Sequence, residues 1–254
     1  MPAKITTPKP KPKSNSQLDG TFPFVSVLTP TYNRARFIPH LIKCYKEQTY
    51  RKDRMEWIIL DDGTESVEHL FKDTGIPNLR YIRMEEKQNI GAKRNRLNDE
   101  ARGDIMVAMD DDDYYMPARV SSVVNSFRKF PNIELAGSSE IYMYYSDIQE
   151  IYKLGPYNAN HATNGTMAWR SSYAKTHRYD ETVTHAEERS FLDDYKNQMI
   201  QLSPKDVMLV MSHSENTFDK KKMREQVNPM VKKTSMKLRD FIRDGSIREF
   251  YATA

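Results

Sequence analysis

The sequence of 254 residues has a single cysteine, Cys44, and no long hydrophobic run. One thiol excludes a disulfide framework and a thiolate zinc site, as expected in a reducing compartment. No apolar stretch approaches the roughly 20 residues that cross a bilayer, and the amino terminus has no apolar core of a signal peptide. These absences predict a soluble, cytoplasmic protein without a transmembrane segment.

Positive charge is scarce in the middle of the chain, although the net charge is +4. Residues 1–20 carry +3 and residues 217–254 carry +5, which leaves −4 for residues 21–216. A nucleic-acid-binding protein usually carries its positive charge on the folded domain. We therefore do not expect a nucleic-acid partner.

Composition divides the chain into three segments. Residues 1–20 are rich in Pro, Lys and Ser and are expected to form a disordered basic leader. Residues 21–216 are long enough for one α/β domain. Residues 217–254 are expected to form a basic C-terminal helical extension, with helical spacing between Val231 and Ile242. This extension is expected to pack on the core or to contact an anionic surface, such as a membrane, peripherally.

Short apolar runs alternate with helical periodicity through the first half of the chain. Strands are predicted at 24–29, 57–60, 79–82 and 105–109, and helices at 36–48, 67–71 and 90–101. This alternation predicts a mostly parallel sheet that is covered by helices on both faces. Further strands are predicted at 133–136, 141–145 and 207–211. No glycine-rich phosphate loop follows the first strand, which argues against Walker and dinucleotide-binding classes.

Four consecutive aspartates, Asp110 to Asp113, follow the predicted strand at 105–109. Ligands of open α/β sheets bind at the carboxyl ends of the strands. Alternating side chains put Asp110 and Asp112 on one side, and adjacent carboxylates repel one another unless a cation compensates. Carboxylate oxygens suit magnesium or manganese. The run predicts a divalent-metal site, and a solvated acidic turn is the alternative.

Polar groups also follow the first two predicted strands. Tyr32 comes after the first strand and Asp62 after the second. A ring beside a carboxylate can recognise a nucleobase, because the ring stacks and the carboxylate accepts a hydrogen bond from uracil or guanine. The alternative for Tyr32 is packing within its turn.

Several of these segments occur in the order found in a known family. The segments are Val25 to Arg34, Ile59 to Thr64, Asn89 to Gly91 with Arg94 and Asn95, and Gly103 to Asp104 leading to Asp110 to Asp113 and Tyr115 to Pro117. Together they resemble the motifs of family 2 glycosyltransferases over residues 24–119. The resemblance implies the GT-A fold, with a Rossmann-like, mostly parallel sheet flanked by helices and a smaller acceptor-side portion. It also implies inverting transfer of a sugar from a UDP- or GDP-linked donor to a glycan or other hydroxyl acceptor.

The resemblance also assigns residues to the donor site by motif position. The nucleotide-sugar would be bound by Pro30, Thr31, Tyr32, Arg34, Asp62, Asn89, Arg94, Asp110 and Asp111. Asp112 would hold Mn2+ or Mg2+ together with the diphosphate of the donor. Asp111 occupies a place that is usually small in the family, so which aspartates bind metal directly stays open.

The second half resembles the family more loosely. The segment from Asn164 to Arg170 resembles the part that shapes the sugar pocket, so Trp169 would stack on a sugar. A tryptophan of the core is the alternative. His213 follows the strand at 207–211, where related members carry a histidine that reaches the metal or the diphosphate. A packing role is the alternative for His213.

An acidic pair, Glu187 and Glu188, resembles the pair that opens a helix in the family. The second member of that pair is the family's catalytic base, and Phe191 and Leu192 align Glu188 with it. Glu187 would then lie in the acceptor pocket. Glutamate stands where aspartate is usual, so Glu187 stays open as the base, with Asp193 and Asp194 next. Acidic residues also stabilise a helix start without any catalytic role.

Two other functions are considered beside glycosyl transfer. A sugar-nucleotide nucleotidyltransferase usually has a glycine-rich, basic loop after its first strand, and Thr29 to Arg34 lacks the glycines. A non-catalytic nucleotide- or glycan-binding module would have a decayed site, whereas the acidic motifs here are intact.

Overall fold

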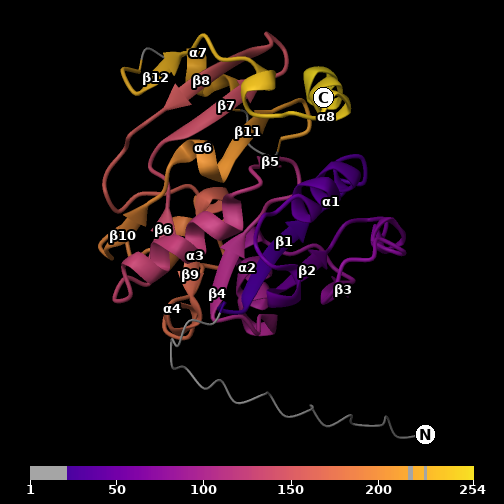
Figure 1. Ribbon diagram of the computed structural model, residues 1–254, viewed down its shortest axis with the longest axis vertical. Helices are drawn as coiled ribbons and strands as arrows, with labels where there is room; N and C mark the ends of the chain where they lie inside the picture. Colours follow the sequence, from indigo (N-terminus) through magenta and orange to yellow (C-terminus); the bar gives the residue numbers. More distant parts are fainter. Residues whose placement is uncertain (1–21, 217–219, 226–227) are drawn as a thin grey trace, which may run out of the picture.

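The structure is a computed structural model that describes residues 22–216, 220–225 and 228–254. The predicted leader at 1–20 lies outside the described residues. The described chain forms two β-sheets, and Figure 1 shows the smaller sheet above the larger one.

The larger sheet has seven strands in the order β10-β6-β9-β4-β1-β2-β3. Its strands are β1 (Val25–Thr31), β2 (Met55–Asp61), β3 (Leu79–Arg83), β4 (Ile105–Ala108), β6 (Leu135–Gly137), β9 (Ala168–Arg170) and β10 (Met199–Gln201). Strands β4, β1, β2 and β3 pair in parallel, while β9 is antiparallel to both β4 and β6. The prediction of a mostly parallel central sheet is confirmed.

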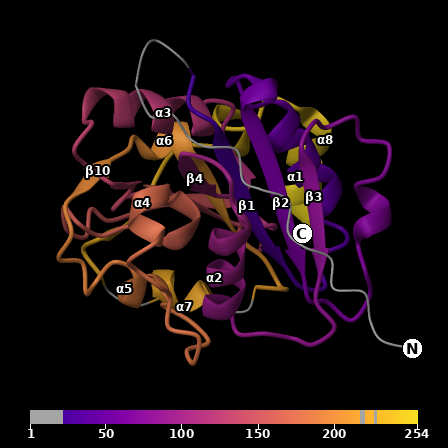
Figure 2. The same cartoon turned by 90° about the horizontal axis from the view of Figure 1, so that it is seen from below.

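Helices cover both faces of this sheet (Figure 2). They are α1 (Ile38–Lys46), α2 (Ile90–Glu100) and α3 (Arg119–Lys129). Alternate residues of β1 separate the faces: Val27 packs in one buried cluster with residues of α1 and α3, and Leu28 packs in another with Leu97 of α2. Tyr45 of α1 stacks on Trp57 with ring centroids 4.5 Å apart. The apolar periodicity of the sequence is therefore satisfied on both faces.

The smaller sheet has five strands in the order β12-β8-β7-β11-β5. They are β5 (Tyr114–Tyr115), β7 (Ile141–Tyr145), β8 (Glu150–Leu154), β11 (Met208–Ser212) and β12 (Val231–Lys233). Strands β7 and β11 pair in parallel, and the other pairs are antiparallel. The aspartate run lies between β4 of one sheet and β5 of the other, so it links the two sheets.

Short helices complete the described chain. They are α4 (Ser171–Ala174), α5 (Glu188–Phe191), α6 (Pro204–Val207), α7 (Lys221–Glu225) and α8 (Gly245–Thr253), with 3-10 turns η1 (Lys52–Arg54), η2 (Glu68–Leu70), η3 (Asn164–Thr166) and η4 (Leu238–Asp240). The helix predicted at 67–71 is only the turn η2. The Asp61 carboxylate accepts hydrogen bonds from the backbone N–H groups of Gly63 and Val67, and these bonds hold that segment as a loop.

The expected C-terminal helical extension needs correction. Its segment from Val231 to Ile242 forms β12 and η4 rather than a helix, because β12 pairs with the edge of β8. The helix α8 begins later, where the Asp244 carboxylate caps it by accepting from Ser246 N and Ile247 N at 2.8 and 3.2 Å. Ile247 and Tyr251 of α8 are buried in the larger core cluster, so the end of the chain packs on the core.

Candidate functional site

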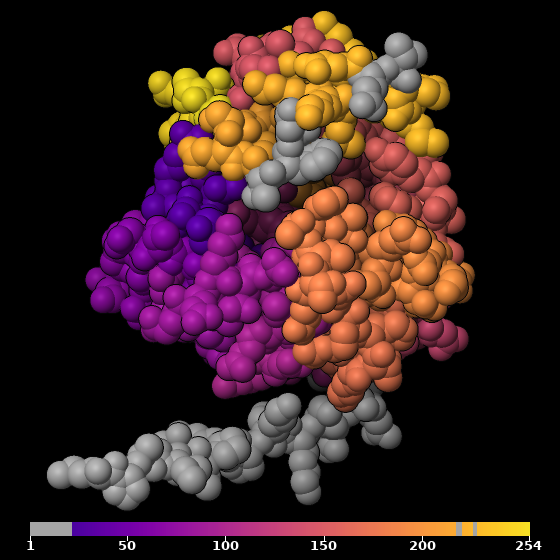
Figure 3. Space-filling view, turned by 180° about the vertical axis from the view of Figure 1, so that it is seen from behind, coloured from indigo at the N-terminus to yellow at the C-terminus, as the bar shows by residue number. Residues whose placement is uncertain are grey.

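A cavity of about 730 Å3 opens where the carboxyl ends of β1 and β4 face the smaller sheet. Its lining comes from the turn after β1, from α2, from the aspartate run, from α5 and from β7 and β11. Figure 3 shows a hollow where the magenta, orange and yellow-orange parts of the chain meet. Segments that are far apart in the sequence therefore converge on one site.

The aspartates of the run have different partners. Asp110 and Asp112 line the cavity, but so does Asp113, because β4 ends at Ala108 and the run lies outside a strand. Asp110 Oδ1 accepts from Arg94 Nη1 at 2.9 Å, whereas Asp112 Oδ2 lies 3.1 Å from His213 Nε2 and 3.9 Å from Arg34 Nε. Each carboxylate is thus held by a different element of the fold.

Burial determines which aspartates of the run are charged. It raises the pKa of Asp111 to about 7, and the neighbouring Asp112 adds to this rise. It raises the pKa of Asp113 to about 8, although the Lys220 ammonium opposes the rise. Burial alone would also raise the pKa of Asp112, but the hydrogen bond from His213 and the charges of Lys220 and Arg34 lower it below its usual value. Asp112 is consequently the carboxylate that stays charged among these three.

Asp112 and His213 form the pair best suited to a divalent cation. Asn216 Nδ2 also donates to Asp112 Oδ2 at 3.2 Å. His213 Nδ1 accepts from Glu215 N at 3.2 Å, and its Nε2 lies 3.1 Å from Asp112 Oδ2 and 2.9 Å from Asn216 Nδ2. Within the described ranges, no group of three or more His, Cys, Asp or Glu side chains has metal-binding geometry. One carboxylate and one imidazole would leave coordination positions for phosphate oxygens and water.

The two glutamates at the start of α5 differ in their hydrogen-bond partners. Glu187 is buried, and its Oε1 accepts from Arg94 Nε at 2.8 Å. Glu188 lines the cavity and has no hydrogen bond or ion pair to another side chain of the described chain. Burial, and then the charge of Glu187, raise the pKa of Glu188 to about 6. A carboxylate of this kind can accept a proton near neutral pH, so the geometry favours Glu188 over Glu187 as the base.

Of Tyr32 and Asp62, which were predicted to recognise a nucleobase, only Tyr32 lines the cavity. Tyr32 is half-buried in the cavity wall, with Lys87 Nζ 4.3 Å from its ring centroid. Asp62 is buried, and both of its oxygens are occupied: Lys93 Nζ donates at 2.7 Å and Gln88 N at 2.8 Å. Asp62 is absent from the cavity lining. Each carboxylate oxygen can accept a second hydrogen bond, so the role of Asp62 toward a nucleobase stays a prediction.

The other predicted donor-site residues lie at different depths. Pro30 and Thr31 are the buried last residues of β1. Arg34 donates to the Glu215 carbonyl at 2.5 Å, so it supports the turn beside Asp112 and does not line the cavity. Asn89 and Arg94 line the cavity; Asn89 donates to the Glu181 carbonyl, and Arg94 donates to both Glu187 and Asp110.

Trp169 does not lie in a sugar pocket, contrary to the expectation from its segment. Its side chain is 2% exposed on β9, and its Nε1 donates to Asn98 Oδ1 at 3.0 Å. Its ring packs edge-on against Phe191, with centroids 5.2 Å apart. β9 lies between β4 and β6 inside the larger sheet, so the residue belongs to the core.

We predict that Trp169→Ala lowers the free energy of unfolding by about 3–5 kcal/mol, because it leaves a cavity in the core and an unpaired Asn98. Urea unfolding followed by circular dichroism measures this loss. A variant of unchanged stability that transfers sugar poorly would instead restore the pocket role.

Two basic residues of the site carried no sequence motif. Lys87 lies over the Tyr32 ring, and Lys220 lines the cavity while donating to the Met211 carbonyl at 2.7 Å. The run Lys220 to Lys222 was visible as basic sequence. Lys220 comes close to the aspartates because β11, which precedes it, pairs with β5, which follows the aspartates. These two strands are more than 90 residues apart, and no local pattern in the sequence indicates that they pair.

Comparisons with known proteins show which family and fold this chain is similar to. Residues 26–144 match the sequence model described as glycosyl transferase family 2. Glycosyltransferase AglE of Haloferax volcanii is 33% identical over 99 residues, which is 37% of this chain and 32% of AglE. The matched region thus spans about a third of that relative's length.

Two solved structures share the fold. S. aureus TarS residues 1–349 in complex with UDP-GlcNAc has a TM-score of 0.60 at 19% identity, covering 76% of this chain and 60% of that one. Mannosyltransferase PcManGT from Pyrobaculum calidifontis in complex with GDP-Man and Mn2+ has a TM-score of 0.59 at 16% identity, covering 81% and 62%. The predicted α/β fold of the GT-A type is confirmed.

The segment 26–144 is similar to glycosyl transferase family 2, and the resemblance found in the sequence is confirmed. Within the part of the chain that the structure describes, no helix is both long and apolar enough to span a membrane.

Proposed function

We propose that the protein is a metal-dependent inverting glycosyltransferase that transfers a sugar from a UDP- or GDP-linked donor to a hydroxyl group of a glycan or another acceptor. The observation that carries this proposal is the lining of one cavity. It combines the charged Asp112, held by His213, with the unpaired carboxylate of Glu188. TarS bound to UDP-GlcNAc and PcManGT bound to GDP-Man and Mn2+ lend support from the same fold.

The donor would lie along the ends of β1 and β4. Tyr32 offers a ring face to the nucleobase, and Lys87 and Lys220 bring positive charge toward the diphosphate. A divalent cation, Mn2+ or Mg2+, would be held by Asp112 with His213 and would neutralise the charge that develops on the departing diphosphate. His213 would take this role through an unprotonated Nε2, because metals bind the unprotonated nitrogen.

Glu188 would accept the proton of the acceptor hydroxyl. As the acceptor oxygen forms its bond to the anomeric carbon, the bond from that carbon to the diphosphate oxygen breaks on the opposite face, and the diphosphate leaves with the electron pair. This single displacement inverts the configuration of the anomeric carbon. The protein contributes mainly by positioning the two substrates and by accepting the proton.

Calorimetric titration with UDP and with GDP tests the donor side of this proposal. We expect one of the two nucleotides to bind in the presence of Mn2+, and most of that binding to disappear when a chelator is added. Equal affinity with and without the metal would contradict the proposed role of Asp112.

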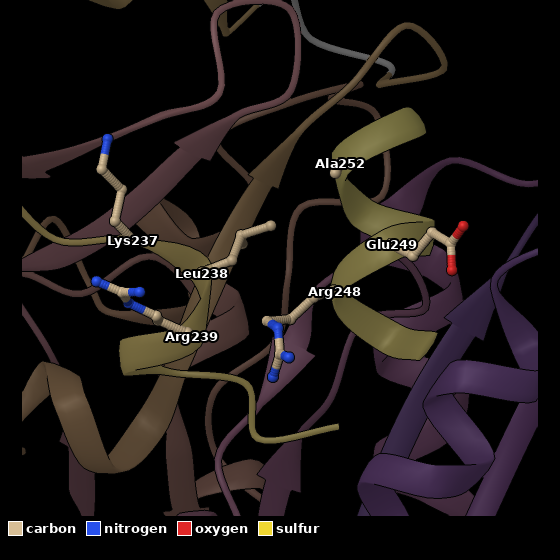
Figure 4. Close-up of a pocket in the computed structure, with 6 residues that line it drawn as sticks. All are labelled: Lys237, Leu238, Arg239, Arg248, Glu249 and Ala252. Carbon is tan, nitrogen blue, oxygen red and sulfur yellow. The ribbon is translucent and has the colours of Figure 1, made fainter. Parts of the chain in front are cut away.

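A cytoplasmic location is also part of the proposal, because the one cysteine, Cys44, is a free, buried thiol. The basic C-terminal residues would allow peripheral contact with an anionic membrane. A shallow hollow of about 490 Å3 lies between η4 and α8, and Figure 4 shows Lys237, Arg239 and Arg248 around it.

A further inference from the structure

The amino-terminal half of α2 lies against the segment that leads to the base, residues 179–188, here called the base segment. Close approach begins at Gly91, where an added Cβ would overlap the carbonyl oxygen of Asp180. Glycine is needed at this position because any side chain would push the base segment away. The contact between α2 and the base segment therefore explains why a glycine is needed at this position, and a phosphate-binding loop does not.

Asn95 of α2 and Asn89, which immediately precedes α2, hold the first part of the base segment. Asn95 Nδ2 donates to the Tyr179 carbonyl at 2.9 Å, and Asn95 Oδ1 accepts from Tyr179 N at 2.9 Å. Asn95 Nδ2 also lies 2.8 Å from Glu181 Oε1, and Asn89 Nδ2 donates to the Glu181 carbonyl at 3.0 Å. A side chain that pairs with both backbone groups of one residue fixes the position of that residue.

Arg94 fastens the end of the base segment to the donor site. It is buried, and it donates from Nε to Glu187 at 2.8 Å and from Nη1 to Asp110 at 2.9 Å. The Asn164 amide, oriented so that it donates to Tyr179 Oη, also accepts from Arg94 Nη1 at 2.7 Å. One guanidinium therefore links the aspartate run to the residue that immediately precedes Glu188.

We propose that Asn89, Gly91, Arg94 and Asn95 form a clamp that positions the base Glu188. This inference rests on the proposed function for the role of Glu188. Within it, Arg94 is a positioning residue, because it acts on the reaction through Glu187 and Asp110.

Charge gives the clamp a second, measurable effect. The ionisable groups around Glu188 are Glu187, Arg94, Asp110, Tyr179 and Tyr195. Burial and the Glu187 charge raise the pKa of Glu188, while the Arg94 charge lowers it. Removing the Arg94 charge should therefore move the acid limb of the rate profile to higher pH. Removing the Glu187 charge should move that limb to lower pH.

The test compares Gly91→Ala and Arg94→Lys with Arg96→Gln as the matched control. Arg96 lies on the same helix, is exposed, and pairs only with Glu100. We expect both clamp variants to lose about tenfold to a hundredfold in single-turnover transfer, because a misplaced base is a poor base. Donor affinity of Gly91→Ala should stay within about threefold of wild type, because Gly91 does not line the cavity, and Arg96→Gln should match wild type in both readouts.

Hydrogen exchange of the base segment tests the clamp without using activity. Exchange at residues 179–188 should become faster in Gly91→Ala and in Arg94→Lys, but not in Arg96→Gln. The pH profiles of Arg94→Gln and Glu187→Gln should shift in opposite directions. Unchanged exchange, or a donor affinity of Gly91→Ala that falls in parallel with transfer, would overturn the clamp. If exchange is faster in the two clamp variants but the wild-type protein transfers no sugar, the clamp stands and the proposed function is wrong.

Discussion

Replacing Glu188 by glutamine is expected to lower the rate of single-turnover transfer by about a hundredfold to ten-thousandfold. Glutamine keeps the size and the hydrogen-bonding groups of the side chain but cannot accept the proton of the acceptor hydroxyl. Donor affinity should stay within a few-fold of wild type, since Glu188 has no partner that it would leave unpaired. Rapid-quench transfer assays and donor titrations on the same preparation measure the two quantities.

Glu187→Gln is the matched control for this variant. Its side-chain oxygen can still accept from Arg94, so we expect a much milder loss, of at most about tenfold. The pH profile adds a third readout. Wild-type transfer should fall as the pH drops through about 6, because protonation of Glu188 removes the base. If Glu187→Gln were the inactive variant, the base assignment would be off by one residue, and if neither were impaired, the base would lie elsewhere.

Replacing Asp112 by asparagine is expected to lower metal-dependent transfer by at least about a hundredfold, because it removes the charged ligand of the proposed cation. The fold should survive. The asparagine oxygen can still accept from His213, so the free energy of unfolding should change by about 1 kcal/mol or less. Nucleotide titration with Mn2+, together with thermal melting, measures both effects.

Asp53→Asn is the control for this substitution, because Asp53 is an exposed partner of Arg51 outside the cavity. It should leave transfer, metal dependence and stability as in wild type. An Asp112→Asn variant that melts early but still transfers sugar would show that the aspartate supports the structure and not the reaction.

The parts of the fold that the sequence predicted have local signals. The apolar runs of β1, β2, β3 and β4 and the helical periods of α1 and α2 lie within single stretches of the chain, and the parallel order follows from their alternation. Two strands of the smaller sheet, β7 and β11, were predicted from their apolar runs, but their pairing into a separate sheet was not. Its strand β5 has two residues, and it pairs with Met208 and Leu209, more than 90 residues later. Such a pairing leaves no pattern within a short window.

The residues of the site likewise divide into those that the sequence predicted and those that it did not. Residues at strand ends could be named from the sequence because a parallel sheet collects those ends at one edge. What each side chain contacts could not be named. Lys93 reaches Asp62 from α2, and Arg94 reaches Glu187 across more than 90 residues. Trp169 was misjudged because a tryptophan in a core and one in a sugar pocket look alike until the neighbouring strand is known.

Nucleoside diphosphate release from a panel of UDP- and GDP-linked sugars, scored with and without a chelator, tests the central claim most directly. The account predicts that one donor is turned over in the presence of Mn2+ or Mg2+, and that the chelator abolishes release. It also predicts that Glu188→Gln abolishes transfer from that same donor while still binding it. Release that does not depend on the metal, or a Glu188→Gln variant that transfers as fast as wild type, would contradict the account.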